Sequence, residues 1–166
     1  MGLSFRDALS GRPRHDGHVE ISFVAGFGPI TVDQAESLSF WGDAVGLELE
    51  QVAPDYYHAA PMDGVRVFAL WPLSQAAQAT FGTPQWPAER PVPQTWLELD
   101  VASHEAVAPA IAELRSAGCE VLLDAHLEPW GQTTGRVQSP EGMLVGISHT
   151  PWLHPGHDSG EQSPAD

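Results

Sequence analysis

Apolar and polar positions follow two different periods along this chain, and the change from one to the other predicts its elements. Residues Glu20–Val32 are rich in β-branched and aromatic side chains, which is typical of a strand. Leu38, Trp41 and Val45 then recur at i, i+3 and i+7, which predicts one apolar face of a helix. A strand followed by a helix therefore opens the folded part of the chain.

Local signals bound this helix and predict the strands after it. Asp33 stands at the N-cap position with Glu36 at the capping-box position, and Gly46 ends the helix. The next three segments are predicted as a strand, a turn or short strand, and a final strand: Leu47–Val52, Asp55–Pro61 and Val65–Pro72. In the first strand, Gly26–Ile30 (GFGPI) predicts a bulge or a sheet edge, because proline cannot donate to a ladder.

The second half of the chain repeats this order. Thr95–Val101 alternates as a strand, and Ser103 caps a helix whose apolar face and end are Val107, Ile111, Leu114 and Gly118. Pro109 is tolerated near the start of this helix or kinks it. Glu120–Ala125 is predicted as a strand, and Glu128–Pro151 as a strand, a turn and a second strand.

The repeated order predicts an α+β fold of two βαβββ modules that form cupped mixed sheets around a cleft. Five segments result: a flexible N-terminal arm (1–17), module one (18–72), a linker loop (73–94), module two (95–152) and a disordered tail (153–166). The first part of the linker is predicted to form a short helix that Gly82 ends. Long loops of this kind are uncommon unless they are functional.

Charge and composition narrow the classes of partner. The formal net charge is −15 and all seven basic residues are arginine, which excludes a nucleic-acid partner and favours a cationic ligand. No apolar run is long enough to span a bilayer, and no apolar secretory segment is visible at the N-terminus. The single cysteine, Cys119, excludes an internal disulfide and is predicted to be a small buried hydrophobe. We expect a cytoplasmic protein that binds no membrane.

Two segments carry a resemblance to a known family. They are Phe40–Glu50, with Phe40-Trp41 and Val45-Gly46-Leu47, and Pro129–Ser148, with Pro129-Trp130-Gly131, Arg136 and Ser139–Met143. In these motifs the chain resembles the vicinal oxygen chelate superfamily, which includes glyoxalase I, extradiol dioxygenases, fosfomycin-resistance enzymes and bleomycin-resistance proteins. The resemblance covers about residues 20–151. It implies a glyoxalase/bleomycin-resistance-like fold and a homodimer.

The resemblance also implies where a metal would be held. The family's histidine and glutamate positions fall on Trp96 and Gly146, and the matching position of module one is Phe68. On the first strand the position is Gly26 or Phe27 in one alignment and His18 in another. Glycine has no ligating side chain and indole is not a normal metal ligand, so we expect no metal cofactor. The alternative is a divalent metal ion held by the displaced ligands His18, Glu98 and His149.

Strand alternation predicts which side chains face the cleft. The predicted sets are Arg66, Phe68 and Leu70 on one strand, Trp96, Glu98 and Asp100 on another, and Leu144, Gly146 and Ser148 on the last. Glu98 is the most informative of these, because an inward carboxylate needs a partner. A bound cation or Arg66 can fill that role.

These observations favour a metal-free binding protein over an enzyme, although the enzymatic alternative stays open. The ligand is predicted to be a small aromatic or cationic molecule, as in the antibiotic-sequestering branch of the family. The expected ligand-binding residues are Phe27, Arg66, Phe68, Trp96, Glu98, Trp130, Gly146 and Ser148. No catalytic residue is assigned. Two alternatives remain: a metal-dependent lyase, isomerase or dioxygenase of the same superfamily, and a scaffold whose 72–94 loop binds a partner protein.

Overall fold

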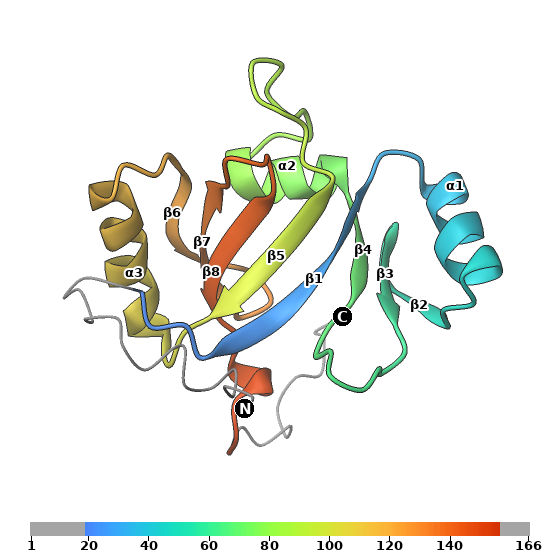
Figure 1. The fold of residues 1–166 in the computed structure, drawn as a ribbon, viewed down its shortest axis with the longest axis horizontal. Helices are drawn as coiled ribbons and strands as arrows, with labels where there is room; N and C mark the ends of the chain where they lie inside the picture. The colour runs from blue at the N-terminus through green and yellow to red at the C-terminus, as the bar shows by residue number, and fades with distance from the viewer. Residues whose placement is uncertain (1–18, 157–166) are drawn as a thin grey trace, which may run out of the picture.

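A single mixed sheet of eight strands organises the protein (Figure 1). The computed structural model describes residues 19–156. The strand order is β2-β3-β4-β1-β5-β8-β7-β6, so the cupped sheets predicted for the two modules join into one. The predicted N-terminal arm and residues 157–166 of the predicted tail lie outside the described residues.

The elements occur in the predicted order. The strands are β1 (Phe23–Thr31), β2 (Leu49–Ala53), β3 (Tyr56–Ala59), β4 (Ala69–Pro72), β5 (Thr95–Asp100), β6 (Val121–Leu127), β7 (Thr133–Gln138) and β8 (Leu144–His149). The helices are α1 (Gln34–Leu38), the π-helix η2 (Ser39–Ala44), α2 (Leu73–Phe81), α3 (His104–Ser116) and the 3-10 turn η3 (Pro151–Leu153). Among residues 19–156, no helix is both long and apolar enough to cross a membrane.

An internal twofold relationship is visible in the strand order. β1 and β5 pair antiparallel at the centre of the sheet, and each pairs on its other side in parallel with the last strand of its own module, β4 or β8. The register of β1 against β5 shifts between Val24 and Gly26. The irregularity thus lies just before Gly26–Ile30, where a bulge or a sheet edge was predicted, and β1 is a central strand and not an edge.

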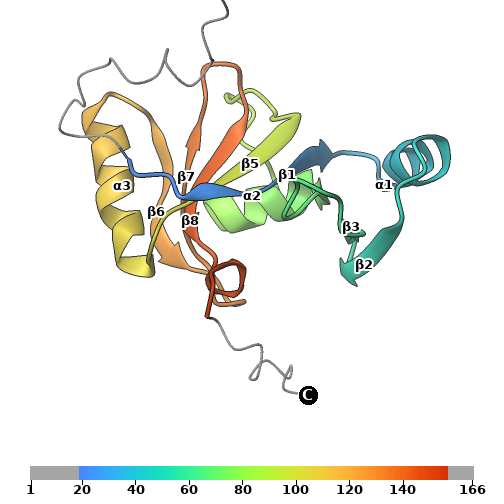
Figure 2. The same ribbon diagram turned by 60° about the horizontal axis from the view of Figure 1, so that its bottom comes forward.

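Module two is closed by a well-packed helix. α3 lies against β6, β7 and β8 in Figures 1 and 2, and its Val107, Ala110 and Ile111 are buried there with Ile147 and Val101. Pro109 lies inside α3 without interrupting it. Ser103 occupies the N-cap position, as predicted, but its side chain makes no capping hydrogen bond.

Module one has a much thinner core. Asp33 caps α1 as predicted, accepting a hydrogen bond from the Glu36 backbone N–H at 2.9 Å. Neither α1 nor η2 contains a buried residue. Trp41, the predicted core residue of this helix, packs instead at the side of the sheet against Phe68, with ring centroids 5.3 Å apart. Val45, expected on the same apolar face, is exposed.

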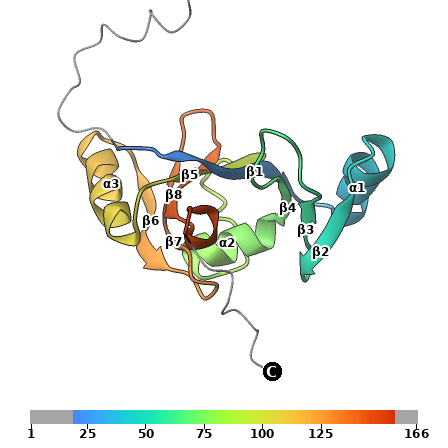
Figure 3. The ribbon, with the colours of Figure 1, turned by 90° about the horizontal axis from the view of Figure 1, so that it is seen from below.

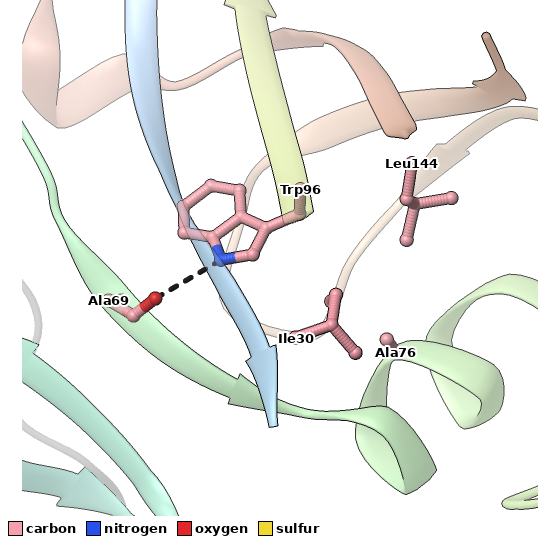
Figure 4. Packing of buried hydrophobic residues seen from close by; sticks show 5 residues of the cluster. All are labelled: Ile30, Ala69, Ala76, Trp96 and Leu144. Carbon is pink, nitrogen blue, oxygen red and sulfur yellow. Dashed lines mark hydrogen bonds between the residues drawn. The ribbon is translucent and has the colours of Figure 1, made fainter. Parts of the chain in front are cut away.

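The linker contributes a second covering element. α2 runs beneath the middle of the sheet in Figure 3, and Gly82 ends it in a left-handed conformation, as predicted. Ala76 of α2 joins a buried cluster with Ile30, Ala69, Trp96 and Leu144 (Figure 4). The helix therefore covers the face of the sheet that carries Trp96, opposite the face that carries α3.

Cys119 is exposed, so the prediction of a small buried hydrophobe is wrong. It directly follows Gly118, which turns the chain out of α3 with a positive φ of 89°. Cys119 thus lies in the exposed turn between α3 and β6.

Candidate functional site

A cavity of about 350 Å³ opens on the face of the sheet that α2 covers. Its floor comes from β1, from β4 with the segment before it, and from β5, and one wall comes from β2 and β3 of module one. The opposite wall comes from the β6–β7 hairpin of module two, while α2 and η3 close the two ends. The residues around it are Ala25, Gly26, Val52, Ala53, Tyr56, His58, Val67, Trp71, Gln75, Trp96, Glu98, Trp130, Gln132, Arg136, Thr150, Trp152 and Leu153.

Four tryptophans line this cavity: Trp71, Trp96, Trp130 and Trp152. Trp96 is fixed from both sides, because its indole N–H donates to the Ala69 carbonyl at 3.2 Å and its ring meets Trp71 edge-on at 5.9 Å (Figure 4 shows the hydrogen bond). Trp130 donates to the side-chain oxygen of Gln132 at 3.0 Å and is partly exposed. The aromatic surface is thus rigid at the floor and open to solvent at the rim.

Glu98 is the buried acidic group of the cavity. Its carboxylate accepts hydrogen bonds from the Thr134 hydroxyl at 2.8 Å and from the Gln132 amide at 3.4 Å. Burial raises the pKa of Glu98, and the charge of Arg136 and the Thr134 hydrogen bond offset only part of that effect. Burial in a low-dielectric site favours the neutral carboxyl, so a cationic partner would restore the ionised form.

Glycines flank Glu98 on both neighbouring strands. Gly26 of β1 pairs with Glu98, and Glu98 pairs in turn with Gly146 of β8. A Cβ on Gly146 would overlap the Glu98 carboxylate, and a Cβ on Gly26 would lie 2.9 Å from the Trp96 ring. The missing side chains therefore make the space that Glu98 and Trp96 occupy.

This row also decides whether the described residues fit the metal that the resemblance implies. The family positions Gly26, Phe68, Trp96 and Gly146 supply no ligand side chain, and Glu98 beside them adds a single carboxylate, whereas a catalytic zinc site uses three protein ligands. The neighbouring Trp96 points its indole N–H at a backbone carbonyl. Among residues 19–156, the family positions do not fit a bound metal ion.

A buried ion pair holds the hairpin wall of the cavity. Arg136 donates to Glu128 at 2.7 Å and to the carbonyl of Ala79 in α2 at 2.7 Å, and both charged side chains are almost fully buried. The arginine thereby joins β7 to α2 across the end of the cavity. Its Nε has no hydrogen-bond partner among the described residues.

The wall from module one carries two titratable groups on one strand. His58 Nε2 and the Tyr56 hydroxyl lie 3.1 Å apart. Burial raises the pKa of Tyr56, with a further contribution from the charge of Glu98, and burial lowers the pKa of His58. Both groups are therefore neutral near pH 7.

Three predicted residues lie elsewhere than the cleft. Phe27 and Phe68 contact each other edge-on at 5.5 Å, and neither lines the cavity. The predicted facing of residues 65–70 is wrong, because Phe68 packs on Trp41 on the helix side and alternation then turns Val67 toward the cavity. Leu70, on the same face as Phe68, is fully buried.

Arg66 does not neutralise Glu98. It lies 3.7 Å above the ring of Phe23 and donates to the Leu153 carbonyl at 2.6 Å. The arginine that acts on Glu98 is Arg136. Arg66 therefore does not line the cavity itself, but it holds the η3 turn, which does.

The remaining predicted residues divide into two groups. Trp96, Glu98 and Trp130 line the cavity together, and Gly146 and Ser148 lie behind Glu98 on β8. Of the alternative ligand set, His18 lies outside the described residues, and His149 contacts the Val101 carbonyl at 3.2 Å and does not line the cavity.

Sequence reasoning missed several contributors to the cavity, among them Tyr56, His58, Gln132 and Trp152. A signal for the first two was present, because Tyr56 and His58 are two residues apart in a predicted short strand and so share a face. No such signal existed for Trp152, since its position depends on how η3 folds back over the sheet.

Comparison with known proteins yields a family match and structural neighbours. The family model for the Glyoxalase/Bleomycin resistance protein/Dioxygenase superfamily matches residues 27–147, whereas no curated protein matches the chain. A solved superfamily member from Vibrio splendidus 12B01 is 20% identical, with a TM-score of 0.51 over 77% of this chain and 98% of its own.

Two further solved structures show how widely this fold is used. An extradiol ring-cleaving dioxygenase from B. fuscum is 17% identical, with a TM-score of 0.54 over 82% of this chain and 35% of its own. A protein described as an NAD-dependent benzaldehyde dehydrogenase from Legionella pneumophila is 14% identical, with a TM-score of 0.52 over 75% of this chain and 96% of its own. At these identities the likeness concerns the fold alone.

Proposed function

Because this chain belongs to the Glyoxalase/Bleomycin resistance protein/Dioxygenase superfamily, whose fold does not dictate one activity, we propose its function from its own cavity. It binds a small aromatic molecule that carries a cationic nitrogen, and it does so without a metal ion. The observation that carries this proposal is one buried carboxyl, Glu98, at the base of a cavity lined by four tryptophans.

The size and lining of the cavity support an aromatic ligand. A volume of about 350 Å³ lies at the lower end of the range for small-molecule sites. Indole rings favour offset or edge-on contact with another ring, and their faces also attract cations. Trp96 and Trp71 are already fixed by contacts with the protein, so little side-chain entropy is lost when a ligand packs against them.

The charges around the cavity support a cationic nitrogen. Arg136 is engaged by Glu128 and by Ala79, so its charge is largely compensated. Among residues 19–156, the side chains that donate to Glu98, Thr134 and Gln132, are neutral. An ammonium group beside Glu98 would form a charge-assisted hydrogen bond, which is about twice as strong as a neutral one. The net charge of −15 adds long-range attraction for such a ligand.

The metal-dependent alternative receives no support from the same geometry. Glu98 and His149, two members of the displaced ligand set, lie in different surroundings, and the first is held by Thr134 and Gln132. We therefore propose sequestration or transport of the bound molecule as the role. A cytoplasmic location and a homodimer stay predictions of the sequence.

The test is a titration of chelator-treated protein, followed by tryptophan fluorescence, with a matched pair of probes. 2-Naphthylmethylammonium carries the cation, and 2-ethylnaphthalene is its neutral isostere. We expect wild-type protein to bind the cation at least about tenfold more tightly, which is the factor that about 1.4 kcal/mol provides. Glu98→Gln should remove this preference while both probes still bind.

Two tryptophan variants separate the cavity from the rest of the protein. Trp130→Ala should weaken both probes, whereas Trp41→Phe, which changes a ring outside the cavity, should leave both affinities unchanged. An equal preference for the cation in Glu98→Gln and wild type would refute the role of Glu98. Binding that appears only after a divalent metal is added would refute the metal-free proposal.

A further inference from the structure

A second group of polar side chains lies at the end of the sheet, where η3 folds back over β5 and β8. Asp100 is fully buried there, and the side chains of His149 and His154 are 15% and 21% exposed. One ligand atom from each of these three residues lies within 4.8 Å of the others. Residues 153 and 154, which the sequence pattern places in a disordered tail, thus contact the body of the protein.

Two of these side chains also contact the backbone. The second carboxylate oxygen of Asp100, Oδ2, accepts a hydrogen bond from the Thr150 backbone N–H at 2.8 Å. Nδ1 of His149 lies 3.2 Å from the Val101 carbonyl and 4.0 Å from Asp100 Oδ1. Since a carbonyl only accepts, Nδ1 carries the proton in this contact, and Nε2 carries the lone pair that can bind an ion once the ring rotates.

This pattern is typical of metal centres. A histidine ligand usually donates its other N–H to a backbone carbonyl or a carboxylate, and a carboxylate ligand is itself hydrogen-bonded. Two imidazoles and one carboxylate also form the ligand set of many catalytic zinc sites, which leave a fourth position for water. The partial exposure of His149 and His154 gives an ion and a water molecule access.

We propose that Asp100, His149 and His154 form a site for one divalent transition-metal ion of the zinc type. His154 Nε2 lies 2.6 Å from Asp100 Oδ1, and the ion takes the place of the proton between these two atoms. Neighbouring ligand atoms lie about 3.3 Å apart around a tetrahedral zinc ion with bonds of about 2.0–2.1 Å. The three ligand atoms lie within 4.8 Å of one another, so binding an ion requires the side chains to rotate until the atoms reach that spacing.

The site is separate from the cavity and from the metal positions of the family. Asp100 lies two residues beyond Glu98 along β5, about 6.6 Å at the usual rise of a strand. None of the three ligands lines the cavity. The ion would instead fasten the turn after β8 to the end of β5, because Asp100, His149 and His154 come from three different segments that meet at this corner. The proposal does not depend on the cavity ligand.

Isothermal titration calorimetry of tag-free, chelator-treated protein with Zn²⁺ alone tests the site. We expect one ion per chain and a rise in Tm of about 5–10 °C when free Zn²⁺ reaches about a hundred times its Kd. His154→Ala and His149→Ala should each lower the affinity by at least about tenfold, since even changes behind a metal ligand have that effect. Asp100→Asn is a less direct variant, because Asp100 is buried and holds Thr150.

Two matched controls use histidines that lie in other elements, His104→Ala in α3 and His126→Ala in β6. Both should bind Zn²⁺ like wild type. Visible absorption of the Co²⁺ form gives an independent readout, since tetrahedral Co²⁺ absorbs far more strongly than the hydrated ion, and this band should be lost in His154→Ala. The absence of a one-to-one binding event would refute the site, as would equal losses in the control variants. In that case the three residues form only a hydrogen-bonded contact between η3 and β5.

Discussion

The two modules share one order of elements but differ sharply in how their helices are packed. In module two, α3 buries Val107, Ala110 and Ile111 against the sheet. In module one, the equivalent helix of α1 and η2 buries no residue, and its Phe40 and the adjoining Val45 are 55% and 49% exposed. The repeat therefore determines topology, while the side chains on each helix determine how much each module adds to stability.

This difference extends to the cavity. Module two contributes buried groups to the cavity and directly behind it, Glu98, Thr134 and Arg136, which are fixed by hydrogen bonds. The wall from module one contains Tyr56 and His58, which are only partly buried. This difference fits the ligand proposed above, with its cationic nitrogen at Glu98 and its ring beside the less buried wall of module one. Predictions about stability can test this division directly.

The largest effect is expected from the core of module two. Ile111→Ala removes a side chain that is 1% exposed and should cost about 2–5 kcal/mol of unfolding free energy, the usual range for such cavities. Leu38→Ala is the matched change in module one, where the helix buries nothing, and should cost about 1 kcal/mol or less. Urea denaturation of both variants measures the difference. Equal losses would show that the helix of module one has a core of its own.

A smaller loss is expected where α3 approaches the sheet most closely. A Cβ on Gly135 of β7 would lie 2.5 Å from Cγ1 of Ile111, so Gly135→Ala should cost about 1–3 kcal/mol through overpacking. Ile111→Ala creates the space that the new methyl group needs. The double variant should therefore lose less stability than the sum of the two single changes, and strict additivity would contradict the close packing.

The elements could be predicted well because their signals are local. The N-cap Asp33, the helix-ending glycines Gly46, Gly82 and Gly118, and the alternation of Thr95–Val101 all act within a few residues. Alternation also places Glu98 and Trp96 correctly on the cavity face, for the same reason. When apolar and polar residues alternate regularly along a strand, the strand's own sequence is enough to assign its two faces.

The errors lie where distant contacts decide. The facing of Phe68 depends on where the helix of module one packs, and that helix is held at the side of the sheet by Trp41. Arg136, and not Arg66, acts on Glu98, and its position depends on a long-range contact in which Arg136 of β7 donates to α2. The polar composition around His154 predicts a disordered tail, whereas its contact with Asp100 spans 54 residues.

At the helix N-termini module one, and not module two, has the stronger local interaction. Asp33 in module one accepts a backbone hydrogen bond from Glu36, whereas Ser103 in module two makes no capping bond. Asp33→Ala should therefore cost about 1 kcal/mol, and Ser103→Ala should change the unfolding free energy by less than about 0.5 kcal/mol. Chemical denaturation at constant pH measures both. A larger loss in Ser103→Ala would mean that the hydroxyl caps α3 in solution.

The smallest effect concerns the titration of the module-one wall. Burial lowers the pKa of His58 below its ordinary value of 6.5, so the unfolded chain takes up this proton before the folded protein does. The unfolded state then binds more protons as the pH falls below about 6.5, and stability decreases.

His58→Gln removes this dependence. The unfolding free energy of the variant minus that of wild type should therefore increase as the pH falls from about 7 to 5. It should stay constant between about pH 7 and pH 8, where His58 is neutral in both the folded and the unfolded chain. Because His58 is partly exposed, the shift is small and needs denaturation curves at each pH. A constant difference across the whole range would mean that the wall of module one leaves His58 open to water.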